Sequence, residues 1–253
     1  MTTASVGTDV RQVALHNPAP TSGMPSILLP RTNVHTADHR TLLWCGIVSA
    51  GLYAALNVFV ALQWPGYSSL SQTVSELSAV DAPTRWLWVP FATVYTLLTA
   101  AFGWGVRHAA VENPPLRVAG GFLVAYGISG LLWPLFPMHL REVLAAGGAT
   151  WTDTAHLTFT AFTVLLMLLA MAFGAAAIGP GFRLYTVVTI ALLATFGALT
   201  GSQAGAVETN TPTPWIGLYE RLNIGVFLVW TVVLAGRLLR GEGSAPTRTQ
   251  EAP

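Results

Sequence analysis

Six long apolar segments constrain this chain more than any other feature of its sequence. A membrane span needs about 20 mostly apolar residues to cross a hydrocarbon core about 30 Å thick. Six such stretches occur without a charge near their middle, over residues 41–64, 86–106, 116–136, 156–178, 184–203 and 216–239. Each is expected to be a helix, because no water is present there to satisfy the backbone. We therefore predict an all-α integral membrane protein, a six-helix transmembrane bundle.

The composition excludes several other classes of protein. Of 253 residues, 53% are hydrophobic and 9% are charged, whereas soluble domains have about 25% charged residues. The net charge is +1 and no basic patch is dense, which argues against a nucleic-acid partner. The single cysteine, Cys45, excludes an internal disulfide or a multi-cysteine metal site. The lipid bilayer is the partner that this composition predicts.

The two ends of the chain differ from its middle. Residues 1–40 are polar, contain four prolines and show no helical period, which is typical of a disordered tail. Residues 241–253 form a second short polar tail. Residues 41–240 remain as one six-span membrane domain.

Arginine placement predicts the orientation of this domain. The chain has no lysine, and an even number of spans places both tails on one side of the membrane. Near the spans, that side carries Arg31, Arg40, Arg107, Arg117, Arg183, Arg237 and Arg240, whereas the other side carries Arg85, Arg141 and Arg221. Positive residues favour the cytoplasm. We expect a plasma (inner) membrane protein with both termini cytoplasmic.

Most of the remaining titratable chemistry falls on the predicted outer side. Residues 65–78 carry Leu70, Val74 and Leu77 at helical spacing, which predicts a short amphipathic helix at the outer boundary between spans one and two. We expect an outer polar cluster made of Glu76, Arg85, His139, Asp153, His156, Glu220 and Arg221.

Two of these segments resemble a known family. The first reads Tyr67-Ser68-Ser69-Leu70-Ser71-Gln72-Thr73-Val74-Ser75-Glu76-Leu77, and the second reads Asp81-Ala82-Pro83-Thr84-Arg85. Together they resemble the signature of the domain of unknown function 998 family, and His156 and Glu220-Arg221 fit the same pattern. The resemblance covers residues 41–240. It implies an uncharacterised prokaryotic multi-pass membrane protein, and it implies no activity, cofactor or catalytic residue.

The outer cluster leaves structural and ligand-binding roles open. Glu220 could pair with Arg85, and Arg221 with Asp153 or Glu76, which would pin helix ends together. Alternatively Arg221, which suits bidentate phosphate contact, could bind a lipid headgroup or another small molecule.

Two hydrolase hypotheses use the same residues, so whether the chain is an enzyme stays open. His139, Asp153 and His156 could bind a metal ion for lipid hydrolysis, although their spacing matches no zinc motif. Asp153 could instead favour the dipole at the start of span four. A serine, Ser71 or Ser75, could act with His156 as base and Asp153 as orienting group.

A small-solute or ion transporter is the third hypothesis. It requires one cavity faced by Asn57, Ser129, Gln203 and Asn223. Gly197, Gly201 and Gly205 recur every four residues and would allow close helix contact, inside the bundle or in a homo-oligomer. Tryptophans at the span ends, including Trp88 and Trp133, are expected to form the interfacial belt.

Overall fold

In the computed structural model, the described residues are 1–2 and 34–242, with side chains described from His39 onward. All regular structure in 34–242 is helical, and this part contains no β-strand. Helix α1 begins at Val34, so residues 34–40 are helical where a disordered tail was predicted. Residues 3–33 of that tail, and all but the first two residues of the C-terminal tail, lie outside the described residues.

Six stretches of helix within residues 34–242 are long and apolar enough to cross a membrane. This confirms the predicted all-α, six-span architecture. The long helices are α1 (Val34–Leu62), α2 (Arg85–Ala109), α3 (Pro114–Ser129), α5 (Trp151–Ala177), α6 (Pro180–Gly201) and α8 (Ile216–Leu239). Short elements lie between them: the 3-10 helices η1 (Ser75–Ser78) and η2 (Gly130–Leu135), and the helices α4 (Arg141–Ala145) and α7 (Ala204–Glu208).

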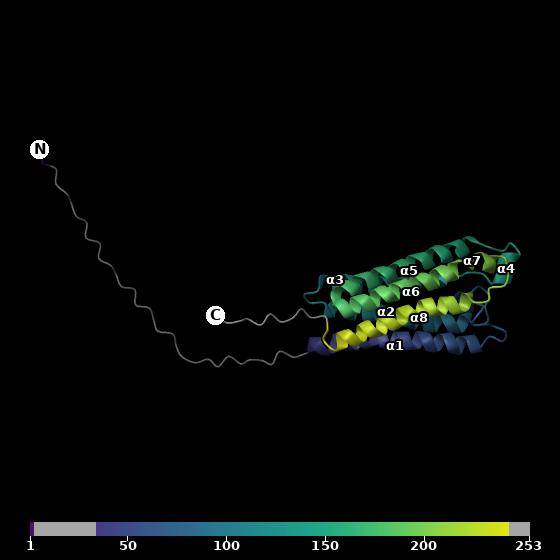
Figure 1. Cartoon of the computed structure of the whole chain (residues 1–253), viewed down its shortest axis with the longest axis horizontal. Helices are drawn as coiled ribbons and strands as arrows, with labels where there is room; N and C mark the ends of the chain where they lie inside the picture. The colour runs from purple at the N-terminus through teal and green to yellow at the C-terminus, as the bar shows by residue number, and fades with distance from the viewer. Residues whose placement is uncertain (3–33, 243–253) are drawn as a thin grey trace. The chain divides into compact units, whose positions relative to one another are not determined.

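The long helices run side by side, and their connections gather at two ends (Figure 1). Helix α1 begins where α8 ends, and Arg40 Nη1 donates to the Leu239 carbonyl at 3.0 Å. The opposite end carries η1, α4 and α7 and the longer connections, and we call it the loop end. The two ends of the membrane domain therefore lie on one side, as an even number of spans requires.

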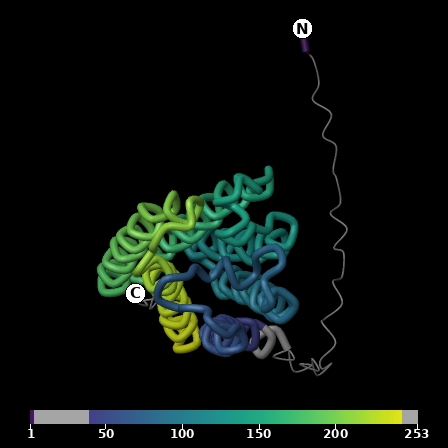
Figure 2. Tube along the Cα trace, turned by 90° about the vertical axis from the view of Figure 1, so that its right-hand side faces the viewer, coloured from purple at the N-terminus to yellow at the C-terminus, as the bar shows by residue number. Residues whose placement is uncertain are grey.

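Each long helix packs against the next one along the chain, and α8 closes the circle against α1 (Figure 2). Helix α2 packs against α1 and α3, whereas α8 packs against α6 and α1. Phe102 and Trp230 are fully buried in the core, and Trp230 Nε1 donates to Thr186 Oγ1 at 3.0 Å. The fifth span is the least covered: 17% of its most apolar stretch is buried, against 33–44% in the others.

The segment between α1 and α2 differs from its prediction. Instead of an amphipathic helix over residues 65–78, it contains turns and the four-residue helix η1. The difference has a physical cause. Side chains from elsewhere in the bundle bond to this backbone, for example Glu220 to the Val74 amide and Arg221 to the Ser69 carbonyl. These bonds replace the regular i to i−4 ladder of a helix.

Candidate functional site

The connection over residues 63–84 folds inward and covers the loop end of the bundle; we call it the roof. A buried ion pair holds its centre. Arg141, at the start of α4, donates from Nε to Glu76 Oε1 at 2.7 Å and from Nη2 to Oε2 at 2.8 Å. The Glu76 side chain is 0% exposed, and the Thr73 amide donates to it at 2.7 Å. These bonds to Glu76 raise the pKa of the Arg141 guanidinium.

Arg221, in the second turn of α8, holds the beginning of the roof. Its Nη1 donates to the carbonyls of Ser69 and Gln72, each at 3.0 Å, and its Nη2 donates to Tyr67 Oη at 2.7 Å. Burial raises the pKa of the Tyr67 phenol, which keeps this hydroxyl protonated. Gly217 permits the close approach, because a Cβ there would overlap the Gln72 carbonyl oxygen.

Further bonds tie the end of the roof to its surroundings. Glu220 Oε2 accepts from the Val74 amide at 2.5 Å. The Val80 amide donates to the Met138 carbonyl at 2.8 Å. Within the roof, Thr84 Oγ1 donates to the Leu77 carbonyl at 2.8 Å. The roof is thus joined to α8, to α4 and to the connection after η2.

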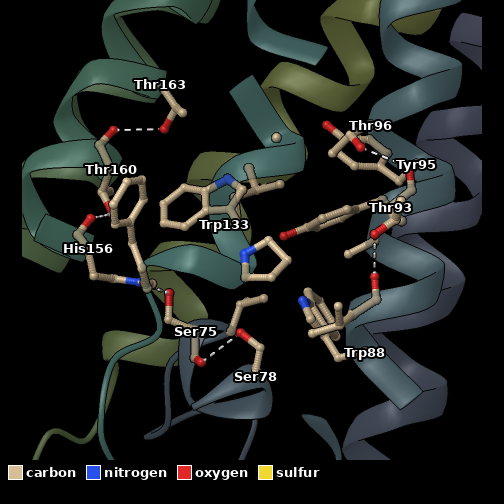
Figure 3. A pocket seen from close by; sticks show the side chains of 18 of the residues that line it. Ser75, Ser78, Trp88, Thr93, Tyr95, Thr96, Trp133, His156, Thr160 and Thr163 are labelled. Atoms are coloured by element: carbon tan, nitrogen blue, oxygen red, sulfur yellow. Dashed lines mark hydrogen bonds between the residues drawn. The ribbon is translucent and has the colours of Figure 1, made fainter. Parts of the chain in front are cut away.

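A cavity of about 180 Å³ lies beneath the roof. Helices α2, α5 and α8 surround it, with η2 and Tyr126 of α3. Six aromatic side chains line it together with aliphatic residues and threonines, and its polar groups at the roof are Ser75, Ser78, Arg85, His156 and Glu220. Figure 3 shows His156, Thr160 and Thr163 on one side of this space, with Trp88, Thr93, Tyr95 and Thr96 on the other.

His156 links the cavity wall to the roof. Its Nδ1 lies 2.8 Å from the Phe136 carbonyl oxygen, and its Nε2 lies 3.1 Å from Ser75 Oγ. The ring also packs against Trp133, with centroids 4.9 Å apart. His156 is 6% exposed. The two hydrogen bonds and the contact with Trp133 together fix the orientation of its ring.

His139 and Asp153 form a separate pair. His139 Nδ1 lies 2.9 Å from Asp153 Oδ2, and the His139 amide donates to Oδ1 at 2.7 Å. Asp153 also accepts from the Thr150 amide at 2.8 Å, which completes a capping box at the start of α5. A carboxylate at this position stabilises a helix N-terminus.

The predicted cluster therefore divides into three groups. Glu76 and Arg221 hold the roof, Arg85, His156 and Glu220 line the cavity, and His139 pairs with Asp153. The candidate metal ligands do not meet: His156 has partners on both nitrogens away from the other two. In the described part of the chain, no group of three His, Cys, Asp or Glu residues has metal-binding geometry.

The ion pairs considered from sequence also differ from those observed. Glu76 pairs with Arg141, and Arg85 donates to the carbonyls of Ser78 and Pro134 instead of to Glu220. Nothing in the sequence distinguishes Arg141, because its partner lies 65 positions away. Only the tertiary fold brings Arg141 next to Glu76 of the Ser-Glu-Leu-Ser segment.

Two tryptophans assigned to the interfacial belt lie elsewhere. Trp88 is 7% exposed and lines the cavity, as does Trp133. Trp86 and Trp151, in contrast, are 76% and 69% exposed at helix ends, where belt residues are expected. Whether a tryptophan near a span end faces the cavity or the surroundings depends on how its helix is rotated. Its position in the sequence does not determine that rotation.

Of the four polar residues that the transporter hypothesis requires, Asn223 alone lines this cavity. Asn223 Nδ2 donates to the Leu193 carbonyl at 2.5 Å. Asn57 instead donates to the Tyr53 carbonyl one turn earlier, and Ser129 to the Tyr126 carbonyl. The four side chains therefore do not form one polar path.

Comparison with known proteins gives one match. The model of a family described as "Protein of unknown function (DUF998)" matches residues 47–237. No curated protein and no solved structure matches the chain.

Proposed function

Because the chain belongs to the DUF998 family, whose description assigns no function, we propose from the site itself that this membrane protein binds an amphiphile in the cavity beneath its roof. The polar end of the ligand lies at Ser75, Arg85 and His156, and its apolar part lies among the aromatic walls. The observation that carries this proposal is an enclosed, mainly apolar cavity whose ionisable side chains, Arg85, His156 and Glu220, lie at the roof. Such pockets are typical of small-molecule sites.

The volume of the cavity limits the ligand. At about 180 Å³, it is slightly larger than an engineered cavity of ~150 Å³ that binds benzene. A whole phospholipid does not fit, whereas a polar linkage and the first carbons of a chain do.

A neighbouring groove supplies room for the rest of an acyl chain. It is apolar and is lined by Leu132 and Phe136 near η2 and by Trp151, Phe159 and Phe162 of α5. Phe136 lines both the groove and the cavity. Because α5 is a membrane-spanning helix, a lipid in the bilayer can place its tail here and its polar linkage inside the cavity.

The remaining cluster residues act structurally in this proposal. Glu76, paired with Arg141, and Arg221 hold the roof over the ligand, and Asp153 caps α5. A metal-dependent lipid hydrolase would need ligands brought together that the fold keeps apart, and a transporter would need a continuous polar path. The cavity therefore favours binding over both alternatives.

Filling the cavity is expected to abolish binding. Ala92 of α2 lines the cavity, so Ala92→Phe should weaken binding at least 10-fold by occupying the space of the ligand. The measurement is a titration of purified protein with a lysophospholipid that carries a fluorophore at the end of its acyl chain. Val94→Phe, on the same helix at a site 46% exposed, is the matched control and should bind like the wild type. The proposal would be contradicted if binding to the wild type did not saturate, or if Ala92→Phe bound the lysophospholipid as well as Val94→Phe.

We further propose that the loop end faces the outside and that both termini are cytoplasmic. Seven arginines near the spans lie on the side of the termini and three on the other, as the positive-inside rule requires. Alkaline phosphatase, which is active only outside the cytoplasm, should be active when fused after Pro214 and inactive when fused after Gly241. The reverse pattern would invert the orientation.

A further inference from the structure

We infer that Ser75 and His156 form a nucleophile and general-base pair that cleaves an ester in the bound amphiphile. This inference deepens the proposed function and rests on it, because the substrate is the ligand of the same cavity. It assigns an activity, metal-independent ester hydrolysis, to two residues that meet across 81 positions of sequence.

The hydrogen bonds of His156 define the proton positions that such a pair needs. The Phe136 carbonyl oxygen can only accept, so His156 Nδ1 carries the hydrogen of the 2.8 Å bond. In the neutral ring, Nε2 is then an acceptor. It therefore receives the hydrogen of Ser75 Oγ, 3.1 Å away. This is the arrangement in which a histidine can take the proton of a serine nucleophile.

The surroundings hold this geometry. Trp133 packs against one face of the His156 ring, and the Phe136 carbonyl takes the orienting role of the aspartate in a catalytic triad. Asp153, which the sequence suggested for that role, is occupied by His139 and by the cap of α5. A backbone carbonyl fixes the same tautomer without adding a second charge.

An acidic and a basic side chain lie in the same cavity. Glu220, whose carboxyl accepts from the Val74 amide next to Ser75, is the acidic one. Arg85 lines the cavity as well. Its guanidinium donates to the Ser78 and Pro134 carbonyls and has further N–H groups for an anionic headgroup or for the oxyanion that develops on the ester.

The reaction balances with water as the only co-reactant. Ser75 Oγ bonds to the acyl carbon while its proton passes to His156 Nε2. The ester C–O bond then breaks, and His156 returns the proton to the departing alkoxide, so an alcohol leaves. Water next attacks the acyl-serine and gives its proton to His156, which returns it to Ser75 as the carboxylic acid leaves.

The position of Ser75 relative to the groove identifies the substrate class. Ser75 lies at the roof, and the acyl groove begins at Phe136, whose carbonyl holds His156. An acyl ester with its chain in the groove would place its carbonyl near Ser75. The substrate is therefore a membrane lipid or lysolipid ester, not a water-soluble peptide.

The test is covalent labelling of the full-length protein in detergent with an alkyl fluorophosphonate. Ser75 Oγ would bond to phosphorus as fluoride leaves, and the peptide that contains Ser75 would gain the corresponding mass. Ser75→Ala should lose the label, and His156→Gln should label at least about 100-fold more slowly, because the base is absent. Ser71→Ala changes a serine of the same segment outside the cavity and should label like the wild type. Hydrolysis of a fluorogenic acyl ester should follow the same order, with a loss on the order of 1000-fold for Ser75→Ala.

The outcomes separate this inference from the proposed function. Lysophospholipid binding by Ser75→Ala, together with loss of labelling and hydrolysis, supports both. Wild-type protein that binds the lysophospholipid but shows no mass gain at Ser75 would overturn the inference and leave the binding function in place. Failure of both binding and labelling in folded wild-type protein would overturn both. The thermal unfolding temperature of each variant is first compared with that of the wild type. If His156→Gln unfolds at a lower temperature than the wild type, His156→Asn is used in its place.

Discussion

Arg141→Met is expected to destabilise the protein by about 3–5 kcal/mol, the usual cost of removing one partner of a buried ion pair. Glu76 is 0% exposed and Arg141 is 11% exposed in this pair. Without Arg141, the Glu76 carboxylate stays buried without an opposite charge, and only hydrogen bonds from Gln72 and Thr73 of the roof remain. The measurement is the free energy of unfolding in a fixed detergent, followed by tryptophan fluorescence.

Two further variants test the cause of this loss. Arg240→Met removes an arginine from a pair in which it is 64% exposed, and exposed pairs contribute at most about 1 kcal/mol. Adding Glu76→Gln to Arg141→Met should recover part of the stability, because the uncompensated charge disappears. If Arg141→Met unfolds like Arg240→Met, the pair does not hold the roof.

The second large effect is expected at Gly127, where α3 lies against α2. A Cβ on Gly127 would overlap the backbone nitrogen of Ala100 and would lie 2.7 Å from its Cα. Because these are backbone atoms, no side-chain rotation relieves the overlap, and Gly127→Ala must separate the two helices. We expect a loss of about 1–3 kcal/mol or more, the usual cost of overpacking.

Gly225→Ala is the matched control for this variant. Gly225 also lies inside a membrane-spanning helix, yet no atom comes within 4 Å of a Cβ built there. Alanine favours the helix over glycine by about 1 kcal/mol, so the stability of this variant should stay equal or rise slightly. The comparison uses the same unfolding assay. Equal stabilities for the two alanine variants would show that the contact between α2 and α3 is less tight than described.

The six spans were predictable because each is a local property of the chain. Twenty apolar residues are long enough to cross a bilayer wherever they occur, and all six predicted segments coincide with helices. The cap of α5 is local too, since Asp153 and Thr150 are three positions apart. The roof was harder to predict: Leu70, Val74 and Leu77 suggested a helix, but residues from α4 and α8 bond to its backbone and determine another conformation.

The candidate site was partly predictable for the same reason. All seven proposed cluster residues have a hydrogen-bond partner at least 14 positions away, and such partners cannot be read from local pattern. Arg141 reaches Glu76 across 65 positions, and His156 reaches Ser75 across 81. The sequence indicated which residue types gather on one side of the membrane, without showing which of them meet.

The sequence by itself determined the membrane class, the number of spans and the end of the bundle at which the residues of the polar cluster lie, because hydrophobic length and the position of a residue relative to the spans are local properties. The tertiary structure alone decided that a roof covers a cavity, that Arg141 neutralises Glu76, and that His156 faces Ser75 instead of Asp153. These contacts depend on how each helix is rotated and at what height it lies, and packing between distant segments determines both.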